Sequence, residues 1–156
     1  DMRAAAVWAL SSSDSTGDIG PQLTDALKQE TDPNVRMRIY QALENQPGAD
    51  PQVVLSLVQN ESDTAALLAG MAFLAGTLHS SPAPEVADFF KQTAVPKLKD
   101  AALNSDSSQN RLAAVIALQR AGTPAATGAL QEIAQQSTDR KVVDSAQKAL
   151  SNQSLP

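Results

Sequence analysis

The chain has 156 residues, a hydrophobic content of 42% and a net charge of −5, which is the composition of a folded domain rather than of a disordered segment. Aromatic residues make up only 3% of it, and small or unbranched apolar residues dominate, which favours helices over strands. The acidic balance argues against a nucleic-acid partner, and the absence of cysteine excludes disulfides and thiolate zinc sites.

About nine helices are expected in chain order, because two kinds of segment alternate. Helices of the first kind follow a capping residue and carry an apolar face; the clearest runs from Asp32 to Leu43, with Val35 and Ile39 on that face. Related copies begin at Asp1, at Ser62 or Asp63, at Asp106 and at Asp139. Copies recur at about 32 residues, with a longer interval before the fourth, as in repeat proteins.

Helices of the second kind begin with proline, which suits the first helical turn because its missing N–H would have no partner there. They start at Pro21, Pro51, Pro84 and Pro124, and Pro96 should kink or split the third of them. A pair of such helices cannot bury its apolar face alone, so stacked pairs should share one core. The sequence therefore predicts one all-α domain over residues 1–156, with antiparallel helix pairs at roughly 1–18, 19–48, 51–80, 84–121 and 124–151.

The stretch Asp-Pro-Asn-Val-Arg at residues 32–36, followed by the pair Ala42-Leu43, resembles the HEAT repeat, especially the subclass named for phycobiliprotein lyases. The resemblance implies a right-handed α-α superhelix of the HEAT or armadillo type. It implies that the Asp-Val-Arg helices line the concave side, and that a further helix precedes Asp1 in the natural chain.

The resemblance also implies a ladder of structural ion pairs between neighbouring repeats. Carried over, its members are Asp32 and Arg36, together with Arg3 and Arg111. The ladder should end in the fifth copy, where Val143 replaces the arginine.

On these helices, the face opposite the expected core is more apolar than a solvated face needs to be. If this face binds a protein or peptide, the candidate contacts are Trp8, Met37, Arg38, Gln41, Glu44, Leu68, Ala72, Leu112, Ile116 and Gln119.

Three interpretations of this apolar stripe remain open. The residues belong to the core and the helical phase is rotated, or they form a groove for an apolar partner segment. Alternatively, the second half of the long segment 80–104 folds back over them, and Trp8 packs on a preceding helix.

Neither a catalytic site, a metal site nor a cofactor is expected. His79 is the chain's single histidine and is interpreted as a solvated loop residue. The His-Glu pairs of the iron hydroxylases that the HEAT family includes are absent, as are Gly-rich phosphate loops. The longest apolar run, Ala65 to Leu78, is shorter than the ~20 residues that span a bilayer.

The sequence thus favours a non-catalytic scaffold that binds a protein or peptide on the concave face. The alternatives are an auxiliary domain of a larger enzyme, a lyase-like chaperone for a prosthetic group, and a structural spacer. The bias toward Gln, Ser, Thr and Ala without Cys leans toward an extracytoplasmic bacterial protein.

Overall fold

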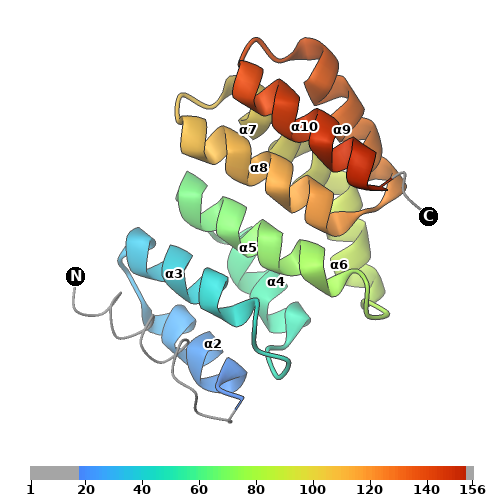
Figure 1. The fold of residues 1–156 in the computed structure, drawn as a ribbon. Coiled ribbons are helices and arrows are strands. Elements are labelled where there is room, and N and C mark those ends of the chain that lie inside the picture. Colours follow the sequence, from blue (N-terminus) through green and yellow to red (C-terminus); the bar gives the residue numbers. More distant parts are fainter. Residues whose placement is uncertain (1–17, 154–156) are drawn as a thin grey trace. The chain divides into compact units, whose positions relative to one another are not determined.

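The computed structural model describes residues 18–153, and every regular element in that range is helical. The elements are α2 (Gly20–Gln29), α3 (Pro33–Leu43), α4 (Pro51–Gln59), α5 (Thr64–Thr77), α6 (Pro84–Phe89), one turn of π-helix, η1 (Phe90–Ala94), α7 (Val95–Asn104), α8 (Ser108–Ala121), α9 (Pro124–Gln136) and α10 (Arg140–Gln153) (Figure 1). The all-α prediction is confirmed. With α6, η1 and α7 counted as one continuous segment, the described residues form eight helical segments, against about nine expected for residues 1–156. The copy expected at Asp1 lies outside them.

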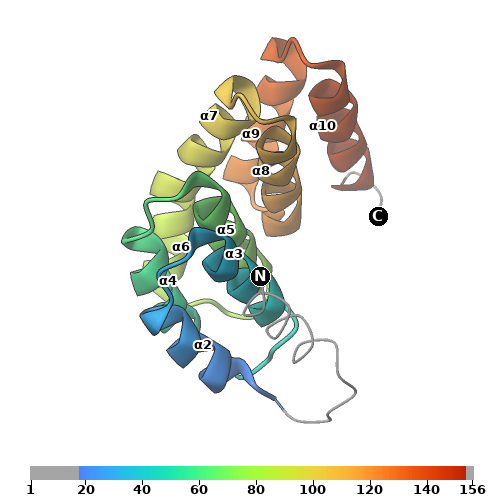
Figure 2. The ribbon, with the colours of Figure 1, turned by 90° about the vertical axis from the view of Figure 1, so that its left-hand side faces the viewer.

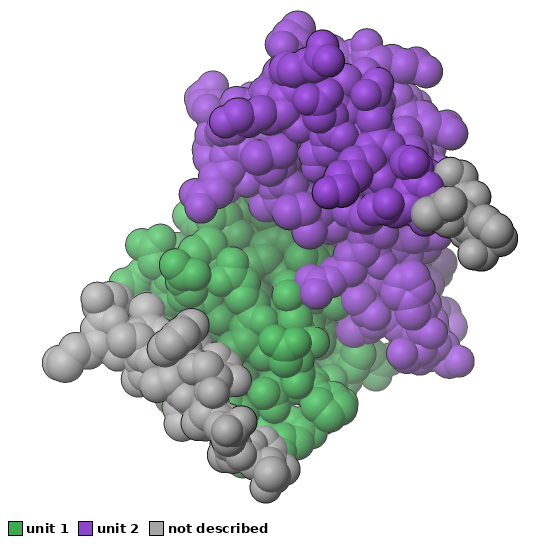
Figure 3. Space-filling view, viewed as in Figure 1, with its two compact units in different colours: residues 1–74 green, residues 75–156 purple. Residues whose placement is uncertain are grey.

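The chain divides into two compact units, residues 1–74 and 75–156, and the boundary falls within α5 (Figure 3). Each unit has its own core of Leu, Val, Ile and Ala side chains. The two units are described separately below.

Helix starts follow the capping chemistry that the sequence indicates. The Asp32 carboxylate accepts a hydrogen bond from the N–H of Asn34 at 2.9 Å, and Asp50 does the same for α4. Proline occupies the first turn of six elements: α2, α3, α4, α6, α7 and α9. The expectation for the fourth copy was wrong by one residue. Ser107 rather than Asp106 caps α8, because its hydroxyl lies 3.2 Å from the N–H of Asn110.

In the first unit, α2 packs against α3 and α4, and Leu27, Ile39 and Val54 are buried. Gly70 on α5 has no side chain because there is no room for one. A Cβ at this position would lie 2.6 Å from Val58 Cγ2 and 3.2 Å from Tyr40 Cε1. The glycine therefore brings the α5 backbone against the Tyr40 ring.

In the second unit, two helix pairs are stacked. The pair α7–α8 and the pair α9–α10 contact each other through α7 on α9 and α8 on α10 (Figures 1 and 2). Leu98, Leu118, Leu130 and Ala146 are fully buried in this core. The stacking gives α8 and α10 a shared outer face on the side away from α7 and α9.

Pro96 was expected to kink or split its helix, but the helical path continues through it. The preceding turn widens to the π form, with the N–H of Val95 bonded to the carbonyl of Phe90. A widened turn absorbs the extra residue and the missing proline N–H without ending the helix. The second half of this segment was also expected, in one interpretation, to cover the apolar stripe. Instead α7 packs against α8 and α9 with Val95 and Leu98 buried, and Ile116 stays 54% exposed.

Candidate functional site

In the first unit, the candidate contact residues on α3 lie at or near the surface. Arg38 and Gln41 are exposed and are joined by a hydrogen bond of 3.3 Å from the guanidinium to the amide oxygen. Met37 and Glu44 are partly buried. Of these four candidate contacts on α3, only Met37 is apolar.

The expectation that Leu68 contributes to an open face was wrong, since its exposed fraction is 4%. Helix α5 is apolar nearly all round, and Ala66, Ala69 and Met71 on its other sides are buried as well. Ala72 is partly buried. The rotated-phase interpretation therefore holds for Leu68, which belongs to the core.

In the second unit the stripe does reach the surface. Among the described residues, Ile116 is the exposed large hydrophobic residue, with an exposed fraction of 54%. Leu112 and Gln119, about one turn before and after it on α8, are partly buried. Trp8, the remaining candidate, lies outside the described residues.

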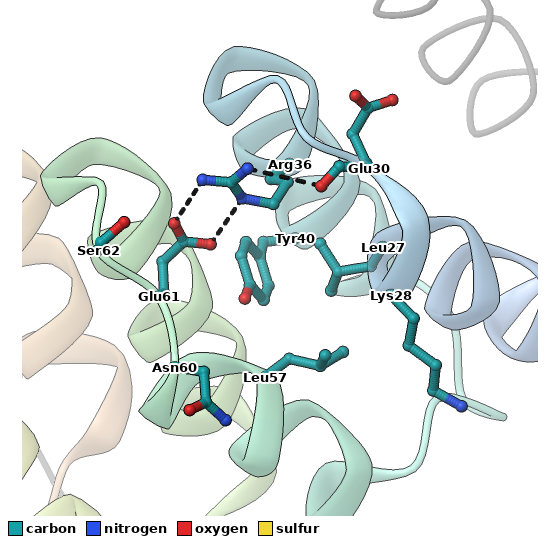
Figure 4. Close-up of a pocket in the computed structure, with 9 residues that line it drawn as sticks. All are labelled: Leu27, Lys28, Glu30, Arg36, Tyr40, Leu57, Asn60, Glu61 and Ser62. Atoms are coloured by element: carbon teal, nitrogen blue, oxygen red, sulfur yellow. Dashed lines mark hydrogen bonds and ion pairs between the residues drawn. The ribbon is translucent and has the colours of Figure 1, made fainter.

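Arg36 makes a bidentate ion pair with Glu61, as Figure 4 shows. Its Nε lies 2.9 Å from Glu61 Oε2 and its Nη2 lies 2.8 Å from Oε1, while Nη1 donates to the Thr31 carbonyl at 2.7 Å. The Glu61 side chain is only 3% exposed. Hydrogen bonding to Glu61 raises the pKa of Arg36, because the charged guanidinium is the form that donates to the carboxylate.

Arg111 repeats this arrangement in the second unit. Its Nε and Nη2 lie 2.9 Å from Asp139 Oδ2, and its Nη1 donates to the Ser105 carbonyl at 2.6 Å. Desolvation opposes ionisation of Asp139, but hydrogen bonds from Arg111 and from the backbone N–H groups of Lys141 and Val142 outweigh it and hold the pKa of Asp139 below its usual range.

Each of these two arginines binds a carboxylate that lies just before the next helix of the same kind. Of the other expected ladder members, Asp32 caps α3 through its side chain, and Arg3 lies outside the described residues. Sequence reasoning missed Glu61 as an acceptor. The available signal was a carboxylate two residues before the capping Asp63, whose own N–H also donates to Glu61.

A pocket of about 280 Å³ opens beside the Arg36–Glu61 pair. It is formed by α2, α3, α4 and the loop after α4, with Tyr40 at its base and Leu27 and Leu57 on its sides (Figure 4). Burial raises the pKa of the Tyr40 hydroxyl well above its usual range, and the negative charge of Glu61 adds to the effect. The hydroxyl is therefore neutral at physiological pH, and the neighbouring carboxylate is already committed to Arg36.

His79 is exposed, as expected for a loop residue, but it makes a specific contact. One ring nitrogen lies 2.6 Å from the carbonyl oxygen of Arg120 near the end of α8. Because a carbonyl only accepts, this nitrogen carries the proton. A Cβ at Gly122, whose φ is +61°, would lie 3.3 Å from the His79 ring. The contact ties the loop after α5 to the α8–α9 turn.

Within residues 18–153, no three His, Cys, Asp or Glu side chains gather as metal ligands would. None of the helices in this range is long and apolar enough to cross a bilayer.

Comparison with protein-family models, with curated proteins and with solved structures gave no match to this chain.

Proposed function

We propose that this chain is a HEAT-like α-solenoid that catalyses no reaction and binds a protein or peptide on its concave face. In the second unit, this is the outer face that α8 and α10 share on the side away from α7 and α9. The observation that carries the proposal is Ile116. It is a large aliphatic side chain, 54% exposed, in the middle of a well-packed helix.

The stacking within the second unit supports the solenoid part of the proposal. There α7 lies on α9 and α8 lies on α10, which is how successive repeats contact each other in α-solenoids. The Arg111–Asp139 contact joins α8 to the start of α10, as a ladder between repeats requires. The Arg36–Glu61 pair joins α3 to the segment before α5 in the same way.

The paired state of the charged groups beside the described pocket supports the non-catalytic part. A general acid or base needs a proton-transfer group that is free to reach a substrate. Beside the described pocket, Glu61 is occupied by Arg36 and by the N–H of Asp63, and the Tyr40 hydroxyl is held neutral. This network stabilises the contact between helices instead of leaving a reactive group exposed.

The position of Ile116 supports the binding part. Of the equivalent residues in the described range, Gln41 on α3 and Lys148 on α10 are polar and exposed, while Ala72 on α5 is small and partly buried. A polar side chain therefore fits this position, and the fold alone does not require an isoleucine. Together with partly buried Leu112, Ile116 gives α8 an apolar strip with polar surroundings, which is the character of a binding surface.

The proposal is tested by capture of partners from a lysate of the source cells with the wild-type protein, the Ile116→Asp variant and a Gln131→Asp control. Gln131 is exposed on α9, so the control adds the same charge elsewhere. We expect all three proteins to show the same helical circular dichroism, and Ile116→Asp alone to lose a specific partner. Equal capture by all three proteins would exclude the α8 face as the binding surface.

A further inference from the structure

Five of the eight Lys and Arg residues of the second unit lie on α8 and α10, the two helices that share the outer face, and the other three lie on η1 and α7. Helix α8 carries Arg111 and Arg120 and no acidic residue, and α10 carries Arg140, Lys141 and Lys148 against a single Asp144. The chain as a whole has a net charge of −5. The two helices together thus carry five basic residues against one acidic residue, and this local charge favours a partner of opposite sign.

Several of these charges are already used within the protein. Arg111 forms an ion pair with Asp139. One turn apart on α10, Arg140 Nε lies 3.1 Å from Asp144 Oδ1. The one carboxylate on α10 is therefore paired with Arg140, and both side chains remain exposed. Lys141 and Lys148 are exposed and have no carboxylate within ion-pair distance among residues 18–153. The positive charge that remains for a ligand thus comes from the lysines of α10.

Lys148 lies on the same outer face as the apolar strip of α8. The two helices lie side by side and contact each other (Figure 1). By the 32-residue spacing of these two copies, Lys148 in α10 corresponds to Ile116 in α8. Equivalent positions on packed neighbouring helices are separated by roughly the interaxial distance of 8–10 Å. An extended peptide covers that distance with about three residues.

We infer that the α8–α10 face binds an acidic peptide segment in which an aliphatic or aromatic side chain lies close to Asp or Glu. The apolar side chain packs on Ile116 and Leu112, and the carboxylate pairs with Lys148. This inference rests on the proposed function and specifies the class of partner. A nucleic acid fits less well, because two lysines neutralise few phosphates and the face offers no exposed aromatic ring for base stacking.

The inference is tested by titrating the full chain, labelled for NMR, with a short capped peptide of alternating leucine and glutamate. Two control peptides replace either the leucines by serine or the glutamates by lysine. We expect the leucine–glutamate peptide to shift the Ile116 methyl signals and the amides of α8 and α10, with weaker binding as NaCl is raised. Both control peptides should bind more weakly.

Two protein variants complete the test. Lys148→Glu should weaken binding of the leucine–glutamate peptide by about two- to fivefold or more, as loss of an exposed ion pair and its replacement by repulsion predict. Lys97→Glu makes the same charge change at an exposed position of α7 and should leave the affinity unchanged. If both variants weaken peptide binding equally, the loss of affinity comes from the changed net charge of the protein and not from Lys148, and the inference is overturned.

The failure of this inference can be told apart from failure of the proposed function. If the leucine–lysine peptide shifts the Ile116 methyl signals with the same affinity as the leucine–glutamate peptide, the apolar surface binds peptides but does not select acidic ones. If none of the peptides shifts these signals, the inference is overturned. The proposed function is then decided separately, by whether the wild-type protein captures a partner that Ile116→Asp does not.

Discussion

At the scale of single residues, Tyr40 carries a hydroxyl group on a side chain that is buried in the first unit. It is 1% exposed and lies beside the Arg36–Glu61 pair (Figure 4). The backbone of Gly70 comes close to its ring. Its hydroxyl has to stay protonated there, because an additional negative charge would be buried next to Glu61. The folded state therefore depends on the neutral form of this side chain.

This dependence predicts alkaline unfolding. Because the pKa of Tyr40 is raised in the folded state, its contribution to stability is complete below the ordinary tyrosine pKa of about 10 and is lost as the pH rises above it. Tyr40 is the single tyrosine of the chain, so tyrosinate absorbance reports on it alone. We expect that absorbance to appear well above pH 10, together with the loss of helical circular dichroism. Ionisation near pH 10 with the helices intact would contradict the burial of Tyr40.

The two arginine contacts should differ in their contribution to stability. Arg36→Leu leaves Glu61 buried without its partner, which costs about 3 kcal/mol in the free energy of unfolding. Arg111→Leu should cost less, since Asp139 is 22% exposed and water can solvate it. Urea denaturation of both variants measures the difference. The double variant Arg36→Leu/Glu61→Leu should recover part of the stability lost in Arg36→Leu. An equal loss of stability in Arg36→Leu and Arg111→Leu would contradict the difference in burial between Glu61 and Asp139.

At the scale of helices, close packing depends on a glycine in one place and tolerates a larger residue in another. Gly70→Ala places a methyl group 2.6 Å from Val58 Cγ2, and such overpacking costs about 1–3 kcal/mol. Gly128 on α9 has no atom within 4 Å of its added Cβ, so Gly128→Ala should stabilise the protein by about 0.5–1 kcal/mol through helix propensity. Thermal unfolding should therefore shift in opposite directions for the two variants, and a shift in the same direction would argue against the packing around Gly70.

Many features of the helices could be predicted from the sequence because they arise from local chemistry. Proline at first turns, the caps by Asp32 and Asp139, and the apolar faces of α3 and α10 follow from residue types at fixed spacing. The π turn before Pro96 could not be predicted in the same way. It depends on keeping Phe90 and Ala94 buried while the chain passes the proline, and that requirement comes from neighbouring helices.

At the scale of the whole molecule, the sequence repeat indicated which helices carry the candidate contact residues. It did not indicate which of those residues stay exposed. Leu68 and Leu112 hold equivalent positions, yet Leu68 is in the core and Leu112 is only partly buried. A helical wheel gives the direction of a side chain, whereas exposure depends on what packs next to the helix. For that reason the stripe separated into a buried part on α5 and an open part on α8.

The pocket beside Arg36 could not be predicted for a similar reason. Its walls come from α2, α3, α4 and the loop after α4, and the acceptor Glu61 is 25 residues from Arg36 in the sequence. The resemblance to HEAT repeats suggested a partner for this arginine but not which carboxylate it would be. Contacts of this kind depend on the loop path between two helices, and that path has no regular period.

The most direct test of the central claim is site-specific photo-crosslinking in the source cells. A photoreactive amino acid replaces Ile116 in one protein and exposed Gln131 on α9 in a second, and crosslinked products are compared by mass spectrometry. We predict a defined protein adduct at position 116 and none of the same species at position 131. If position 116 yields no adduct, or both positions yield the same mixture, the outer face of α8 is not a binding surface and the scaffold account fails.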